Sequence, residues 1–148
     1  MKKFKFRLET LKKQRKVAQD LAQREYAEAQ KAVQDQLGHI QAMYESSDKT
    51  RMDNEQLQFQ GGACADRLRM NEEYIEGLKI KIQRARQKAR ELMQVAEEKL
   101  EILSEKRKDL KILEKLKENR EAEHKKEYKK KEAKALDDIT SMRIFHKE

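Results

Sequence analysis

Residues 60–66 read QGGACAD, and this short stretch decides the fold. It holds two of the four glycines of a 148-residue chain that contains no proline. Because proline is the strongest helix breaker, its absence leaves the backbone free to be helical on both sides of the stretch. Glycine ends helices by adopting positive φ at little cost, and Asp66 is a suitable N-cap for a following helix. The sequence therefore predicts helices over about residues 4–58 and 67–143, joined by a turn at about 59–66.

The composition agrees with a narrow packing seam between two helices. Charged residues make up 43% of the chain and hydrophobic residues 36%, which is too little for a thick globular core. Disorder is the competing interpretation of so polar a chain, but the regular spacing of apolar residues argues against it. We expect an all-α fold, in which two long helices form an antiparallel coiled-coil hairpin as one domain over residues 1–148.

The second helical arm shows the stronger periodicity, because apolar residues recur every seven positions, as in a coiled coil. One series is Ile75, Ile82, Ala89, Ala96, Leu103 and Leu110. A second is Leu78, Ala85, Leu92, Lys99, Lys106 and Leu113. Where the second series turns polar, we expect Leu100 and Leu116 to fill the seam.

The first helical arm follows a step of eleven residues, about 3.67 per turn, which is typical of a nearly straight helix. Its two series are Leu11, Ala22, Val33 and Tyr44, and Ala18, Ala29 and Ile40. Tyr44 continues this step, so we expect it to lie in the seam. Tyr74 stands beside the seam residue Ile75, so we expect it to be a contact residue on the surface.

The two arms are unequal in length, with about 55 residues before the turn and about 80 after it. Counted outward from the turn, Phe4 should lie opposite about Arg120, so that residues 121–148 overhang without a partner. The overhang ends with apolar residues at helical spacing: Ala135, Leu136, Ile139, Met142 and Phe145. Such a stripe predicts a docking surface. The alternatives are a short contact with Phe4 and Phe6, or a frayed end.

Nothing in the sequence predicts catalysis or a bound cofactor or metal. His39, His124 and His146 are far apart, and no cysteine or histidine pair has the spacing of metal ligands. The adjacent glycines lack the lysine and hydroxyl residue that complete a phosphate-binding loop. Because a two-helix fold also offers no deep pocket, we expect no enzyme activity.

The charge distribution makes one end of the predicted hairpin basic. The net charge is +8, and the first 16 residues hold eight Lys or Arg against one acid. In a hairpin this segment lies near a second basic stretch at residues 125–134. An acidic protein and a merely solvated surface are the leading interpretations. Nucleic acid is less favoured, since stacking aromatics are few and no known motif is present, and an anionic membrane surface is a further alternative.

Compartment is indicated by two features. The lone Cys64 suits a reducing environment, and no apolar run reaches the length of a membrane span. We therefore expect a cytoplasmic protein without a transmembrane segment.

Both ends of the chain resemble a known family. Residues 3–11, KFKFRLETL, read K-F-x-F-R-L-E-x-L, as at the start of FliJ flagellar export proteins. Residues 136–139, LDDI, followed by Arg143 and Phe145, are similar to the family's basic ending. The glycine-containing turn near residue 60 and the longer second helix also match the family's plan, so the resemblance covers the whole chain.

The resemblance implies a non-enzymatic part of the flagellar type III export apparatus, peripheral to the inner membrane. Proteins of the family form a two-stranded coiled coil that resembles the central stalk of rotary ATP synthases. They insert into the ring of the export ATPase FliI, contact the export gate protein FlhA and are associated with the escort of export chaperones. A homologous stalk of a virulence injectisome, a basic coiled coil that binds nucleic acid and a client-holding hairpin are the alternatives.

The resemblance also implies two sets of contact residues. The basic end with both termini would enter the ATPase ring, through Phe4, Phe6, Arg7, Leu8, Leu11, Ile139, Met142 and Phe145. The export-gate contact would use Gln36, Ile40, Tyr44, Tyr74 and Leu78. Ser47, Lys81 and Ala85 depart from the apolar, aromatic or histidine character that the family's gate-contacting surface leads us to expect at these places.

Overall fold

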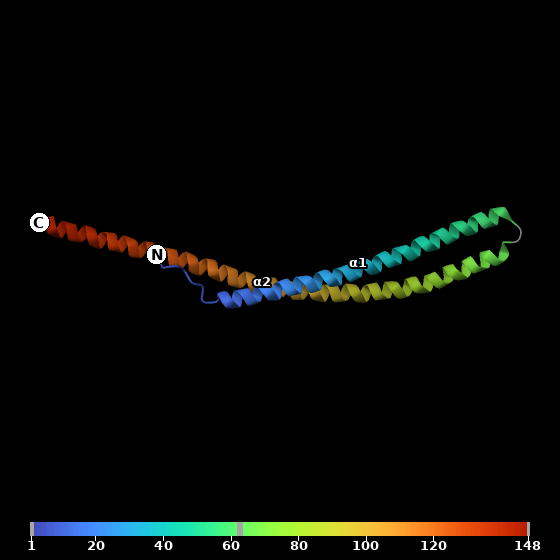
Figure 1. The fold of residues 1–148 in the computed structure, drawn as a ribbon, viewed down its shortest axis with the longest axis horizontal. Coiled ribbons are helices and arrows are strands. Elements are labelled where there is room, and N and C mark those ends of the chain that lie inside the picture. Colours follow the sequence, from blue (N-terminus) through green and yellow to red (C-terminus); the bar gives the residue numbers. More distant parts are fainter. Residues whose placement is uncertain (1, 62–63, 148) are drawn as a thin grey trace. The chain divides into compact units, whose positions relative to one another are not determined.

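The computed structural model describes residues 2–61 and 64–147. In this part the chain forms two α-helices, α1 (Glu9–Gln60) and α2 (Ala65–Lys147), and no strand. The helices lie side by side and run in opposite directions (Figure 1). The predicted all-α hairpin with a longer second helix is thereby confirmed.

The turn follows the sequence prediction except at the start of α2. Gly61 has a φ of 60°, the left-handed conformation that ends a helix and that glycine adopts most easily. Gly62, also predicted to form the turn, lies outside the described residues. Asp66 is not the N-cap, because the amide of Leu68 already donates to the carbonyl oxygen of Cys64 at 3.0 Å. Asp66 instead lies in the first turn of α2, where its negative charge interacts favourably with the helix dipole.

The first helix begins later than predicted, at Glu9 rather than near residue 4. Three lysines at positions 2, 3 and 5 would place positive charge at a helix N-terminus, where the macrodipole opposes it, whereas Glu9 is favoured there. The preceding segment has its own anchor, since Phe6 is only 8% exposed and its carbonyl oxygen accepts a hydrogen bond from the Glu9 amide. At the other end of the chain, α2 continues to Lys147, beyond the predicted end near 143.

The chain divides into two compact units, each containing part of both helices. The turn unit comprises residues 22–61 and 64–103, and the terminal unit comprises residues 2–21 and 104–147. The single domain over residues 1–148 stays a prediction.

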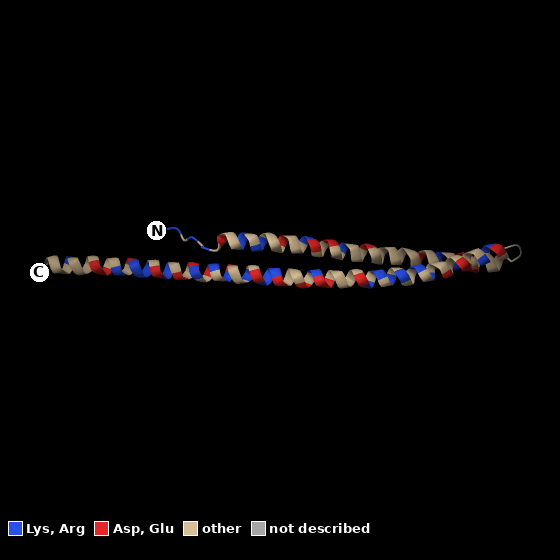
Figure 2. Ribbon diagram, turned by 90° about the horizontal axis from the view of Figure 1, so that it is seen from below, with Lys and Arg blue, Asp and Glu red and all other residues tan. Residues whose placement is uncertain are grey.

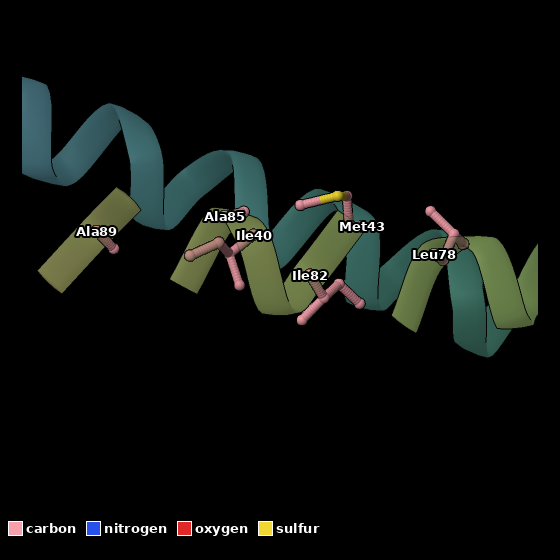
Figure 3. Close-up of a cluster of buried hydrophobic side chains, with 6 residues drawn as sticks. All are labelled: Ile40, Met43, Leu78, Ile82, Ala85 and Ala89. Carbon is pink, nitrogen blue, oxygen red and sulfur yellow. The ribbon is translucent and has the colours of Figure 1, made fainter. Parts of the chain in front are cut away.

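The turn unit is held together by a thin apolar seam. Its central cluster, drawn in Figure 3, consists of Ile40, Met43, Leu78, Ile82, Ala85 and Ala89. Most predicted heptad positions of α2 in this unit are buried, as the seven-residue step requires, whereas Leu92 and Ala96 are half-buried. The predicted position of Tyr44 in the seam is wrong, because Tyr44 is 41% exposed and Met43 lies in the seam instead. A phenol ring in so narrow a seam would need a partner for its hydroxyl group, whereas the flexible methionine side chain needs none.

The polar interruption of the seam is also resolved differently from the prediction. Leu100 does not fill the gap but is 42% exposed, and Lys99 keeps its half-buried place in the heptad series. The Lys99 ammonium nitrogen lies 3.4 Å from a carboxylate oxygen of Glu25. The methylene stem of a lysine can occupy a seam while its charged end reaches an acid at the edge, so the register is kept.

Closer to the turn, the two helices are joined by polar contacts. The Asn71 side-chain amide donates to Asp53 at 2.9 Å and to Asn54 at 2.8 Å, and Arg67 pairs with Asp53 at 3.5 Å. Ser47 is the buried polar residue of this stretch, at 6% exposure. Because Leu57 and Ile75 are also buried in this stretch, hydrogen bonds and apolar packing together specify this end of the seam.

In the terminal unit, two ion pairs bracket the apolar contacts. Arg15 lies 3.1 Å from Asp109, and Lys117 lies 3.1 Å from Glu9. The hydrogen bond from Lys117 lowers the pKa of Glu9 below its ordinary value, although desolvation opposes the shift; the charges of Lys117, Lys12 and Lys13 add to the lowering. Both side chains of this pair are about one-third exposed, so it aligns the helices more than it stabilises them.

Beyond Tyr128, α2 packs against no other part of the chain that the structure describes. Every residue from 129 to 146 is exposed. This segment, orange to red in Figure 1, forms the overhang. It is shorter than the predicted overhang of residues 121–148, because His124 lies against the ring of Phe4 and the carbonyl oxygen of Lys2.

Candidate protein-contact surfaces

The turn unit carries an open groove between α1 and α2. Its volume is about 450 Å³, and it is lined by Gln36, His39, Met43, Leu78, Lys81, Arg84, Ala85 and Lys88. The floor is apolar, while three cations spaced three and four residues apart stand along one side of α2. No acid lines the groove, so it suits a ligand that combines negative charge with an apolar anchor.

This cationic rim is a feature that our sequence reasoning missed. The signal was present, since residues 77–90 contain six Lys or Arg and no Asp or Glu. On a helix such a run wraps around the axis, and only the seam position decides which of its members share a side. Lys81, Arg84 and Lys88 line the groove, whereas Lys79 forms an ion pair with Glu76 at 2.9 Å.

The residues predicted to contact the export gate do not form one continuous surface. Ile40 and Leu78 are buried in the seam, at 8% and 5% exposure. The Gln36 side chain donates through Nε2 to the carbonyl oxygen of Ala85 at 3.0 Å, so its amide is already engaged within the hairpin. Gln36 and Leu78 nevertheless line the groove, and a ligand seated there would touch both.

The two tyrosines lie on different sides of the hairpin. The hydroxyl groups of Tyr74 and Ser46 are 2.8 Å apart, and Tyr74 is 49% exposed. Ser46 is seven residues from the groove residue His39 and so lies on nearly the same side of α1. Tyr44 precedes Ser46 by two residues, about 200° around the helix, and therefore faces away from the groove. Tyr74 alone can act together with the groove.

The N-terminal residues predicted to contact the ATPase pack against the chain itself. The ring centroids of Phe4 and His124 are 5.6 Å apart, and the imidazole Nε2 of His124 lies 3.3 Å from the carbonyl oxygen of Lys2. Phe6 is buried, whereas Arg7 is exposed. Leu8 and Leu11 are half-buried. The alternative contact of Phe4 with the apolar end of the chain is not formed among the described residues.

The predicted contact residues of the overhang are all exposed. Ile139, Met142 and Phe145 are 51%, 66% and 83% exposed. Ile139 and Met142 are three residues apart and share a side of α2. Phe145 points about 120° away from Ile139, so the apolar surface of the overhang extends over more than one side.

No group of three or more His, Cys, Asp or Glu within residues 2–61 and 64–147 could hold a metal ion. In the same part of the chain, neither helix combines the length and apolarity that a membrane span requires.

The fold defines a coiled-coil hairpin protein, and its candidate contact surfaces lie along the outside of two helices. The family model for the flagellar FliJ protein matches residues 4–148. The chain therefore belongs to the FliJ family and is a component associated with flagellar protein export. No match was found among curated proteins or among solved structures.

Proposed function

We propose that this chain is the non-enzymatic stalk of the flagellar export apparatus. In this proposal the terminal unit inserts into the ring of the export ATPase FliI, and the turn unit contacts the export gate protein FlhA. Escort of export chaperones belongs to the proposal through family membership alone. A stalk couples its partners by contact and needs no catalytic residue of its own.

The observation that carries the proposal is the overhang of α2. A lone helix in water is marginal, and most helices gain their stability by packing an apolar face. Residues 129–146 are all exposed, yet they include Leu136, Ile139, Met142, Ile144 and Phe145, each at least 51% exposed. These side chains lie on several sides of the helix. The lumen of a ring surrounds an inserted helix on all sides, which accounts for this distribution better than a flat docking surface does.

The test compares hydrolysis by the cognate export ATPase with and without this chain. Met142 and Phe145 are the residues to change, because Phe6 is buried and its truncation would disturb the fold. We expect the chain to stimulate hydrolysis and the double variant Met142→Ala with Phe145→Ala to reduce that stimulation about tenfold, as for two contact residues at an interface.

Phe59→Ala is the matched control, since Phe59 is 94% exposed and lies in the turn unit. It should leave the stimulation intact. If the unchanged chain gives no stimulation under conditions in which the ATPase forms rings, the coupling role is excluded. Equal loss in the control variant would exclude the terminal unit as the specific contact.

A further inference from the structure

The overhang carries a stripe of side chains that continues the hairpin seam. In the terminal unit Leu113 is buried and Lys117 pairs with Glu9 of α1. Eleven residues make about three helical turns, so steps of eleven from these positions stay on the same side of α2. They lead from Leu113 through His124 to Ala135, and from Lys117 through Tyr128 to Ile139. Phe4 covers the stripe at His124.

Beyond Tyr128 the stripe has no partner among residues 2–61 and 64–147. Its members there are exposed, with Ile139 at 51% and Met142 at 66%. It is continuous with an interface that already binds a helix, α1. The geometry therefore fits a second helix that occupies the place where α1 is absent.

The charge order along the overhang narrows the identity of that helix. Residues 125–134 contain six lysines and two glutamates, whereas residues 135–142 contain two aspartates and no Lys or Arg. A uniformly acidic helix would be repelled by Asp138, and a uniformly basic helix would be repelled by the lysines of residues 125–134. A helix with the reverse charge order meets both halves favourably, and the same segment in antiparallel orientation has that order. Figure 2 shows charges of both signs along this part of α2.

We propose that two copies of this chain associate through antiparallel pairing of residues 128–142 of α2. Lys131 and Asp138 lie about 80° and 100° from Ile139 in the same direction around the helix, so both flank the stripe on one side. In an antiparallel pair these flanks face each other, and Lys131 of one copy lies beside Asp138 of the other. Two-fold symmetry forms this ion pair twice.

The same register also fits the apolar residues. It places Ala135 next to the two-fold axis, where a small side chain lets the helices approach closely. Tyr128 of one copy then packs against Ile139 and Met142 of the other. Glu132 lies inside the stripe, and Lys129, three residues earlier on the same helix, can neutralise its charge.

The paired form does not depend on the proposed function. It covers Ile139 and Met142, which the stalk proposal also uses, so pairing and insertion into a ring exclude each other. Self-association is measured on the chain alone, and its failure leaves the stalk proposal untouched.

The first test measures the molar mass of the full chain in solution, by sedimentation or light scattering over a concentration series. We expect a reversible dimer that Ile139→Asp converts to a monomer. Ile144→Asp is the matched control, since Ile144 is 60% exposed but points about 140° away from Ile139, and it should remain dimeric. Circular dichroism checks that both variants keep the helicity of the unchanged chain and are therefore folded. An unchanged chain that is monomeric throughout, or a dimer that survives Ile139→Asp, overturns the proposal.

The second test examines the register by charge reversal. Lys131→Asp should weaken the dimer about tenfold, because two attractive pairs become repulsive. Adding Asp138→Lys should restore the affinity. Lys130→Asp changes the net charge equally but lies on the far side of α2, so it should have little effect. Failure of the second substitution to restore the dimer overturns antiparallel pairing in this register.

Discussion

Leu103 and Leu100 show how strongly a two-helix seam distinguishes neighbouring positions. Leu103 is the most buried large side chain among the described residues, at 1% exposure, whereas Leu100, three residues earlier, is 42% exposed. Each residue turns the helix by about 100°, so a small change of register decides between seam and solvent. The apolar character of a residue therefore does not by itself determine whether the residue lies in the seam or faces solvent.

The contrast between Leu103 and Leu100 predicts how single substitutions change the stability of the seam. Leu103→Ala removes a fully buried side chain and should lower the free energy of unfolding by about 2–3 kcal/mol, at the lower end of the range for buried leucines, because a thin seam can partly collapse. Urea denaturation followed by circular dichroism measures the change. Leu100→Ala, the same substitution at an exposed position, should cost less than about 1 kcal/mol. Equal losses in the two variants would contradict the seam described for α2.

The errors of sequence interpretation also belong to the scale of single residues. Met43 rather than Tyr44 occupies the seam, and Lys99 rather than Leu100 keeps the heptad position. In both cases periodicity located the helix face but not the occupant, since the occupant depends on the space left by the opposing helix. The eleven-residue step placed Ala22 and Ile40 correctly in the seam, whereas Leu11, Ala18, Ala29 and Val33 are only half-buried.

At the scale of the helices, the side of α1 on which a residue lies determines what it can contact together with its neighbours. Tyr74 is joined to Ser46 on the groove side, while Tyr44 faces away. A pattern carried over from a family lists both tyrosines as equivalent, and only the packed pair of helices separates them.

This separation gives the prediction for the gate contact. If the groove binds the cytoplasmic part of the export gate protein, Tyr74→Ala should weaken binding about tenfold, as the loss of an exposed aromatic anchor does. Tyr44→Ala, also an exposed tyrosine, should change the affinity little. Calorimetry with the purified gate domain measures both. A larger loss for Tyr44→Ala would place the contact on the opposite side of the turn unit.

The start of α1 is the element that the sequence could not place. Periodicity allowed a helix from residue 4, and the resemblance made Phe4 and Phe6 available to a partner. Instead the N-terminal lysines and the burial of Phe6 favour an irregular segment packed on α2. Such a contact joins residues more than a hundred positions apart, as between Lys2 and His124, and no local pattern encodes it.

For the whole molecule, the absence of proline and the position of the glycine pair were sufficient to predict the hairpin and the longer second helix. The candidate contact surfaces were harder to predict from the sequence than the fold. The overhang was predictable because it follows from unequal lengths alone, but the groove was not, because its lining depends on which sides of α1 and α2 face each other.

The prediction for the whole molecule concerns limited proteolysis. The six lysines of residues 125–134 lie where α2 has little or no packing, so trypsin should cut there first. The remaining fragment should keep its helical signal and its melting transition, because the buried side chains all lie before residue 114. Mass spectrometry of the early products identifies the cut sites. Early cleavage within residues 77–90, which are also rich in Lys and Arg, would contradict this distribution of stability.

The cross-links between the two helices have a consequence for the order of folding. Asn71 and Asp53 are separated by 18 positions in sequence, Gln36 and Ala85 by 49, Glu25 and Lys99 by 74, and Arg15 and Asp109 by 94. Closing a loop becomes only slowly more costly as it lengthens, and each contact formed shortens the loop that remains to be closed for the next. The hairpin can therefore zip from its turn outward, so that the N-terminal segment is the last to find its place.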